Sequence, residues 1–428
     1  MITLEAILFL VFGLVAGRLF YAPGLDYYIL NGSMLLHWSV PLLQYFYDLV
    51  AIGGFIVLVI MARQPGPRSE RRRFWTIFVL AAVMVIGTSA RHAVVRATHQ
   101  PWHVTHDGAL QTEAAAELLL AGKNPYAVSY VGTILDNVTG DSLPASSSPK
   151  THYAYPPLTF LVAVPMVLMA KNIGTVPEVQ MVYVIALFVG VIAIVRLLPT
   201  WRSRSLWTIL TLGNPFIFLY PVAGYNDALA IGLVLLAVAL AARRQWGWAG
   251  LAFGLALGAK QLVWAAAPLW AWWLWLQSRM VDQTQRRALW RSMAVTAITA
   301  AVIYGPFLVW NAPALYDDLI RYVSGNIPLS YPIGGSTLWQ LKVILDPVHN
   351  AWGPIPSTVV QVSVGLVMLA LMMRWLQKNP TLSQLLFGTV MVTFGLSLTS
   401  RFVFDNYLSS LVWLGAAAFV LADHEQRS

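Results

Sequence analysis

Apolar runs of about the length of a bilayer crossing recur along most of the chain. A spanning α-helix needs about 20 consecutive, mostly apolar residues. Runs of this kind lie at residues 4–20, 40–62, 74–95, 178–198, 205–222, 228–242, 290–310, 358–375, 382–399 and 408–422. This pattern predicts an all-α polytopic integral membrane protein.

Two further apolar segments are less regular. Residues 156–170 contain three prolines, which weaken a straight crossing. Residues 246–275 are too long for one helix and short for two. We predict that they form a hairpin of two short helices broken near 258–260.

Basic residues predict which side of the membrane each loop faces. Arginine and lysine crowd five short loops, which the positive-inside rule places in the cytoplasm together with both termini: 63–73, 196–204, 243–244, 279–291 and 374–378. A crossing at 156–170 would put the second of these loops outside. We therefore expect that segment to dip in and return or to lie at the outer interface, which gives about twelve crossings in all.

This topology divides the chain into three parts. Residues 1–73 hold two extra N-terminal helices and a basic loop. Residues 74–311 form the main transmembrane module, including a long polar outer loop at 96–155. Residues 312–428 hold a second outer loop and the C-terminal helices.

The composition supports a membrane protein and excludes several other classes. Hydrophobic residues make up 58% of the 428 residues and charged residues only 11%, and the mean hydropathy is +0.65. Ordinary soluble domains and disordered chains are more charged. The absence of cysteine excludes disulfide scaffolds and cysteine-ligated metals. The net charge of +9 fits cytoplasmic loops, so we predict no nucleic-acid partner.

The first outer loop carries the strongest candidate for chemistry. Asp107 precedes apolar residues Leu110, Ala114 and Leu118, whose spacing predicts an amphipathic juxtamembrane helix over 110–121. A carboxylate at the membrane face suits a general base that deprotonates a hydroxyl group. It equally suits an N-cap for this helix, and the two roles are compatible.

The histidines of this loop do not make a convincing metal site. His99, His103 and His106 have a helical spacing, but Pro101 interrupts any helix there. A zinc site needs three or four such ligands in one place. We therefore predict no metal and no cofactor.

A second polar cluster lies where the loop returns to the membrane. Lys150 suits a lipid phosphate as a point charge, and it also suits an ordinary solvated lysine. His152 and Tyr155 follow it. Tyrosine at a membrane boundary is expected without any function.

Ionisable residues at membrane depth are functional candidates by default. Asp227 begins a predicted helix, so it suits either a functional carboxylate or an N-cap. Lys260 lies among apolar residues and needs an anion or a cavity, unless it snorkels to the interface. Arg401 suits bidentate phosphate contact, or an ion pair with Asp405 or Asp107.

Together these segments resemble the GT-C superfamily of polytopic glycosyltransferases. The nearest resemblance is to glycosyltransferase family 87, the polyprenyl-phosphate-mannose-dependent mannosyltransferases. It covers the chain from residue 74 onward and rests on the order of several stretches rather than on one motif: 107–126, 155–157, 214–215, 224–227, 254–261 with Pro268, and 401–407.

The resemblance implies a GT-C-like bundle that moves a sugar from a polyprenyl-phosphate donor to a glycolipid or glycan acceptor. Mannose is the favoured sugar. Asp107 would act as general base, with inversion at the anomeric carbon, and Lys150, Lys260 and Arg401 would hold the donor phosphate. Further candidates for substrate contact are His106, Glu113, His152, Tyr155, Tyr225, Asn226, Asp227, Asn406 and Tyr407.

Two other functions fit parts of the pattern. A transporter or lipid flippase would use Asp227 and Lys260 as coupling groups along a path through the membrane. A polyprenyl-linked glycan ligase or polymerase would favour arginine over a carboxylate base in its outer loops. A transferase instead predicts that Asp107 faces the same cleft as Asp227 and Arg401. The expected location is the plasma membrane, with the site on the exoplasmic side.

Overall fold

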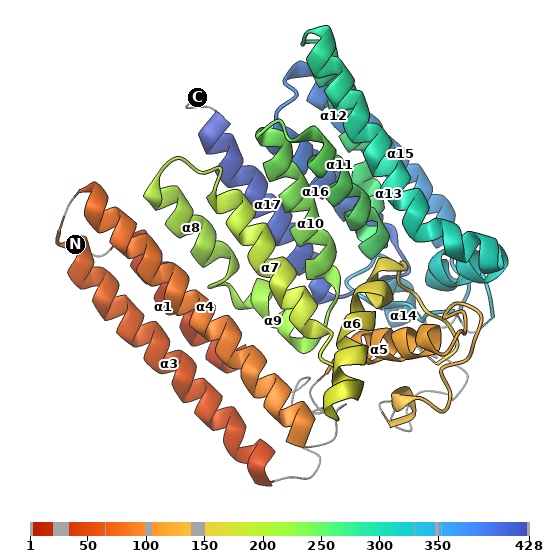
Figure 1. Cartoon of the computed structure of the whole chain (residues 1–428), viewed down its shortest axis with the longest axis horizontal. Helices are drawn as coiled ribbons and strands as arrows, with labels where there is room; N and C mark the ends of the chain where they lie inside the picture. Colours follow the sequence, from red (N-terminus) through yellow and green to blue (C-terminus); the bar gives the residue numbers. More distant parts are fainter. Residues whose placement is uncertain are drawn as a thin grey trace.

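The computed structural model describes residues 3–19, 34–64, 66–98, 105–137, 150–328, 330–346, 351 and 353–425. Almost all of the regular structure in these residues is helical, which confirms the predicted all-α class. Figure 1 shows long helices lying side by side, with short helices and loops gathered at one end of the bundle.

The N-terminal helices form one edge of the bundle. They are α1 (Leu4–Leu19), α3 (Met34–Ala62) and α4 (Pro67–Thr98), and they pack in this order (Figure 1). The first outer loop then forms α5 (Asp107–Leu120) and the 3-10 turn η1 (Ile134–Asn137).

Shorter helices fill the centre. They are α6 (Leu158–Ile173), α7 (Gln180–Val195), α8 (Trp201–Thr211), α9 (Pro215–Ala223), α10 (Asp227–Ala242) and α11 (Trp246–Ala259). The opposite side holds η2 (Gln261–Ala265), α12 (Ala266–Ser278), α13 (Gln283–Tyr316), the π-helical turn η3 (Asp317–Tyr322), α14 (Gln340–Leu345), α15 (Ser357–Lys378) and α16 (Leu382–Thr399). The last helix, α17 (Asp405–Glu425), returns to pack against α10 and α16.

Two very short strands join two outer segments that are far apart in the sequence. β1 (Gly334–Gly335) pairs in parallel with β2 (Phe402–Val403). Gly335 has a φ of 72°, and a Cβ there would overlap the carbonyl oxygen of Val403, so the close pairing needs glycine.

The helices differ in whether they are long enough to cross a bilayer. Six described helices are long and apolar enough to cross, or seven if the bent pair α8 and α9 forms one span. Five further apolar helices, α1, α6, α7, α10 and α11, are shorter. The predicted count of about twelve crossings is therefore not confirmed.

The two irregular segments have different outcomes. The break predicted near 258–260 is confirmed, because α11 ends at Ala259, Lys260 is extended, and α12 begins after one 3-10 turn. The prediction that residues 156–170 dip into the membrane and return is wrong, because α6 is one continuous helix that contains Pro165. The division into three parts stays a prediction.

The predicted juxtamembrane helix is confirmed as α5, but most of it is buried. Residues 108–116 of α5 are all buried, including Gln111 and Glu113. Beyond these residues, exposure begins only at Glu117, in the last turns of the helix.

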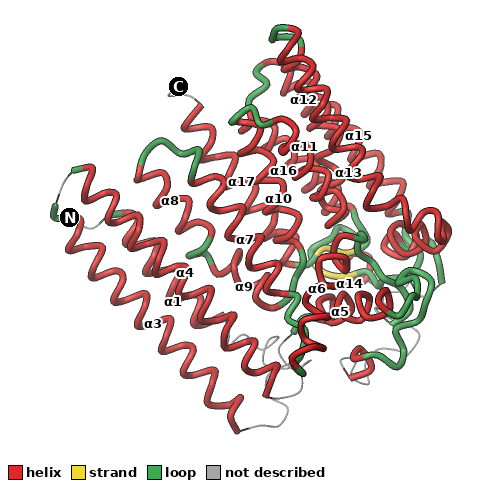
Figure 2. Tube along the Cα trace, in the orientation of Figure 1, coloured by secondary structure: helices red, strands yellow, loops and turns green. Residues whose placement is uncertain are grey.

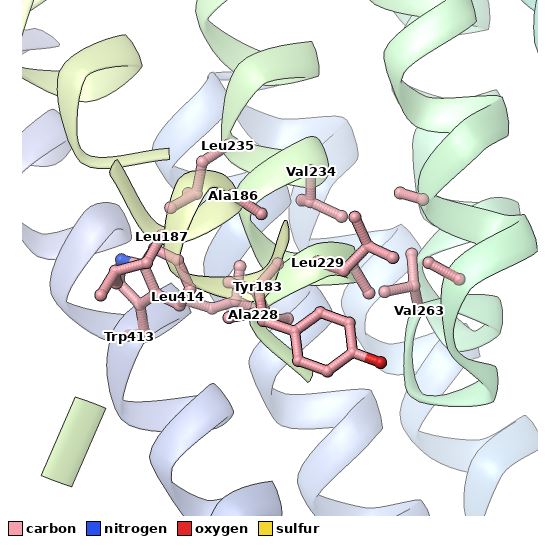
Figure 3. Packing of buried hydrophobic residues seen from close by; sticks show 14 of the residues in the cluster. Tyr183, Ala186, Leu187, Ala228, Leu229, Val234, Leu235, Val263, Trp413 and Leu414 are labelled. Carbon is pink, nitrogen blue, oxygen red and sulfur yellow. The ribbon is translucent and has the colours of Figure 1, made fainter. Parts of the chain in front are cut away.

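Close helix packing in the core depends on small residues. Figure 3 shows Tyr183 and Leu187 of α7 packed with Leu229 of α10 and Trp413 of α17. A Cβ on Gly232 of α10 would overlap the carbonyl oxygen of Ala186. Small residues let transmembrane backbones approach where no water-driven hydrophobic effect holds the helices together.

We expect Gly232→Ala to separate α7 from α10 and to destabilise the protein by about 1–3 kcal/mol. The measurement is the melting temperature of purified protein in detergent. Gly415→Ala in α17 is the matched control, because nothing lies within 4 Å of its added Cβ. A Gly232→Ala protein that melts with the wild type would contradict this account of the packing.

Candidate active site

One cavity of about 940 Å³ lies at the loop-rich end of the bundle. Figure 2 shows the loops and the strand pair gathered there. Segments from distant parts of the sequence line it: the start of α5, residues 152–155, residues 224–226, the break at Lys260, and residues 402–407. Each is a loop or a helix end, so their backbone groups and side chains are free to face a ligand.

His106 and Asp107 enter the cavity together at the start of α5. The predicted N-cap role of Asp107 is wrong. The N-cap is His106, whose Nδ1 accepts a hydrogen bond of 3.0 Å from the backbone N–H of Gly108. The Asp107 side chain is 38% exposed and therefore accessible from the cavity.

This cap fixes the protonation pattern of His106. Because Nδ1 accepts a hydrogen bond, the proton of the neutral ring is on Nε2, which lies 3.1 Å from Asp107 Oδ1. Burial lowers the pKa of His106, which favours this neutral form. The ring also stacks on Tyr225, with 3.7 Å between ring centroids. The Nε2 of His106 and the carboxylate of Asp107 therefore lie side by side at the start of α5.

Lys260 and Asp227 form a buried ion pair. Lys260 lines the cavity and Asp227 does not, so the prediction that Asp107 shares a cleft with Asp227 and Arg401 is wrong. The Lys260 ammonium lies 3.3 Å from Asp227 Oδ1 and donates to Asn226 Oδ1 at 2.6 Å. Asn406 donates to the other Asp227 oxygen at 2.7 Å. Asp227 is therefore part of a network rather than a simple N-cap. The anion required by Lys260 is Asp227, and snorkelling to the interface is excluded because the lysine is only 4% exposed.

Two tyrosine rings complete the surroundings of the lysine. The Lys260 ammonium lies 4.9 Å from the centroid of Tyr155 and 5.3 Å from that of Tyr407. Such cation–π contacts stabilise a cation that has lost its water. Lys260, Asn226, Tyr155, Asn406 and Tyr407 line the cavity.

His152 is held in the cavity wall by a carboxylate from a distant segment. Its Nδ1 lies 2.6 Å from Asp318 Oδ1, and its ring packs on Tyr322. Asp318 lies 166 residues further along the chain, in η3. No periodicity or motif connects the two positions, so sequence reasoning could not identify Asp318 as a partner.

Glu113 does not reach the cavity. Its carboxylate is held by both terminal nitrogens of Arg96, at 3.0 and 2.8 Å, and by the backbone N–H of Val179 at 3.2 Å. Arg96 also donates to the carbonyl of Pro177 at 2.7 Å. This buried pair joins α4, α5 and the start of α7, so the structure places Glu113 in a structural role rather than in substrate contact.

Two of the three predicted phosphate ligands also lie outside the cavity lining found among the described residues. Lys150 pairs with Asp136 at 3.2 Å in the outer loop. Arg401 donates to the carbonyl oxygens of Tyr331 and of Gly353, the latter at 3.4 Å. Its alternative pairing with Asp405 or Asp107 is not found. Arg401 joins two outer segments and is not exposed to a ligand.

No metal site is found in the part of the chain that the structure describes. No group of three His, Asp or Glu side chains there could hold an ion. Of the loop histidines considered for zinc, His99 and His103 lie outside the described residues.

Comparison with known proteins assigns a family to most of this structure. The model of glycosyltransferase family 87 matches residues 153–422, which is more than half of the chain. No curated protein and no solved structure matches the chain. The match includes Asp227, Lys260 and Asn406, whereas Asp107 precedes it.

We expect Glu113→Gln to destabilise the protein by up to about 3–5 kcal/mol, because it removes the bidentate carboxylate of the buried Arg96 and leaves only Glu178, 3.7 Å away, to compensate its charge. The melting temperature of the purified protein measures this loss. Glu117→Gln is the matched control, since Glu117 lies one turn further along α5 and is exposed. Equal melting temperatures for the two variants would contradict a structural role for Glu113.

Proposed function

We propose that the chain, which belongs to glycosyltransferase family 87, transfers a sugar from a polyprenyl-phosphate donor to an acceptor hydroxyl group at the exoplasmic face of a membrane. Membership of the family supports a membrane glycosyltransferase. The donor, the side of the membrane, and the plasma-membrane location are our proposal.

The proposed mechanism rests on the accessibility of the Asp107 carboxylate. Its carboxylate lines the cavity, does not cap the helix because His106 does so, and lies 3.1 Å from Nε2 of that histidine. A general base must be able to reach the hydroxyl group whose proton it takes.

In the proposed reaction, Asp107 takes the proton of the acceptor hydroxyl as its oxygen attacks the anomeric carbon. The bond between that carbon and the phosphate oxygen breaks, and its electron pair leaves with the polyprenyl phosphate. Attack from the face opposite the phosphate inverts the anomeric configuration. No nucleotide is needed at the outer face for these steps, because the sugar–phosphate bond supplies the leaving group.

Lys260 is the cation that we assign to the departing phosphate. Of the three predicted phosphate ligands, it is the one that lines the cavity. A preorganised cation stabilises charge as it develops on a leaving group. Lys150 and Arg401 are not assigned this role.

The apolar walls of the cavity support a lipid-linked substrate. Phe216 and Leu219 of α9 line one side, and Leu262 of η2 with Leu396 of α16 line another. These helices lie within the bundle, so a prenyl chain is able to contact apolar side chains while its phosphate meets Lys260. Mannose is proposed as the sugar on the family resemblance alone.

The other two functions receive less support. A transport path needs Asp227 and Lys260 to act as coupling groups along it, but the two are paired with each other and Asp227 does not line the cavity. A ligase that relies on an outer-loop arginine would need Arg401 in the cavity, and it binds backbone carbonyls instead.

We expect Asp107→Asn to reduce transfer about 10²–10⁴-fold, the usual contribution of a general base. The assay uses purified protein in lipid nanodiscs, labelled polyprenyl-phosphate mannose and a membrane lipid extract as acceptor. The anomeric configuration of the product, compared with the donor, reports inversion.

Glu117→Gln on the same helix is the control and should transfer at the wild-type rate. Undiminished transfer by a folded Asp107→Asn protein would refute the assignment of the base. Retention of configuration would refute direct displacement.

A further inference from the structure

His152 and Asp318 form a histidine–carboxylate pair that the proposed reaction does not use. The His152 Nδ1 lies 2.6 Å from Asp318 Oδ1, and Asp318 is 2% exposed. The second carboxylate oxygen accepts the backbone N–H of Tyr153 at 2.8 Å. The carboxylate is therefore fixed by two donors from the same short segment and cannot rotate.

This arrangement decides which nitrogen of His152 carries the proton. A carboxylate accepts hydrogen bonds and does not donate them, so Nδ1 carries the hydrogen. In the neutral ring, Nε2 then has a free lone pair and is an acceptor. Within the described residues, the ring makes no second side-chain hydrogen bond, and His152 lines the cavity beside Tyr322.

We propose that Nε2 of His152 accepts a hydrogen bond from a ring hydroxyl group of the donor sugar, which makes His152 a specificity-determining residue. This inference rests on the proposed function. The donor sugar is the appropriate partner because the acceptor hydroxyl and the phosphate both meet at its anomeric carbon. The whole sugar ring must therefore lie in the cavity, among the residues that line it.

A fixed acceptor distinguishes sugars more strongly than an apolar wall does. A site built to bind a hydroxyl group rejects an analogue without it by about 10⁴–10⁵-fold, because the protein acceptor is left unpaired. The neighbouring Tyr322 ring limits rotation of the imidazole, since the two ring centroids are 4.7 Å apart. His152 is thus both oriented and unable to turn away when its partner is missing.

The substitution Asp318→Asn tests this geometry with almost no change of shape. The backbone N–H of Tyr153 requires an acceptor, so the amide oxygen must face Tyr153 and the NH₂ group must face His152. Nδ1 then has to accept, and the proton of the neutral ring moves to Nε2. The group that faces the sugar changes from an acceptor to a donor.

The neighbouring carboxylate offers a matched control. Asp317 precedes Asp318 in η3, and its side chain pairs with Arg321 at 2.8 Å outside the cavity lining. Asp317→Asn makes the same chemical change one residue away. A third variant, His152→Asn, keeps an amide N–H for Asp318 near the position of Nδ1 and removes Nε2.

The experiment measures kcat/KM in nanodiscs with polyprenyl-phosphate mannose and with its 2-, 3-, 4- and 6-deoxy analogues. We expect His152→Asn, which removes Nε2, to lose about 100-fold or more with the full sugar, while Asp317→Asn matches the wild type. Asp318→Asn should lose less, because a sugar hydroxyl group can also accept a hydrogen bond from Nε2–H. For one deoxy donor, the wild type should be as slow as His152→Asn, so that the difference between them disappears.

The outcomes separate this inference from the proposed function. Absence of transfer by the wild type from all of these donors would refute mannose as the sugar of the proposed function. Transfer by the wild type, with His152→Asn equal to Asp317→Asn, would refute the role of His152. An equal loss for every donor would assign the pair a purely structural role, and a fall in melting temperature would accompany it.

Discussion

The buried ion pair between Lys260 and Asp227 is the interaction on which the outer end of this bundle depends. Removing two charges from water costs several kcal/mol per ion, and the mutual attraction compensates only when the remaining polar atoms are also bound. Asn226 and Asn406 supply two such bonds, and Asp227 Oδ1 has Lys260 as its ion-pair partner. The pair thereby joins the break after α11, the start of α10 and the start of α17.

Short central helices make room for that arrangement. α10 has 16 residues and is therefore about 24 Å long, less than the roughly 30 Å of a bilayer core. Because such helices end before the outer surface, α5 and the later outer segments are able to fold over their ends. The polar cavity lies in this space.

The sequence predicts a feature correctly where neighbouring residues in the chain determine it. The apolar runs, the juxtamembrane helix, the break at Lys260 and the need of that lysine for an anion all follow from neighbouring residues. Partners were not predictable in the same way. The partner of Glu113, Arg96, lies on another helix, and a backbone partner of Arg401 lies in a separate outer loop. Neither pairing is visible from neighbouring residues, so the sequence predicts substrate contact for both. The capping of α5 by His106 rather than Asp107 depends on a ring orientation that residue spacing does not specify.

The two histidine–carboxylate pairs of the cavity have opposite polarity. In the first, a backbone N–H binds Nδ1 of His106, so Nε2 carries the proton of the neutral ring beside Asp107, whose carboxylate lines the cavity. In the second, the carboxylate of Asp318 is buried and the ring of His152 lines the cavity, with Nε2 as its acceptor nitrogen. The lining of the cavity therefore includes two hydrogen-bond acceptors and one lysine. A sugar phosphate has the complementary chemistry, because its hydroxyl groups need acceptors and its phosphate needs a cation. This match between the cavity and a sugar phosphate does not depend on the family assignment. It follows from the backbone hydrogen bonds to His106 and to Asp318, which determine which atoms of each pair remain available.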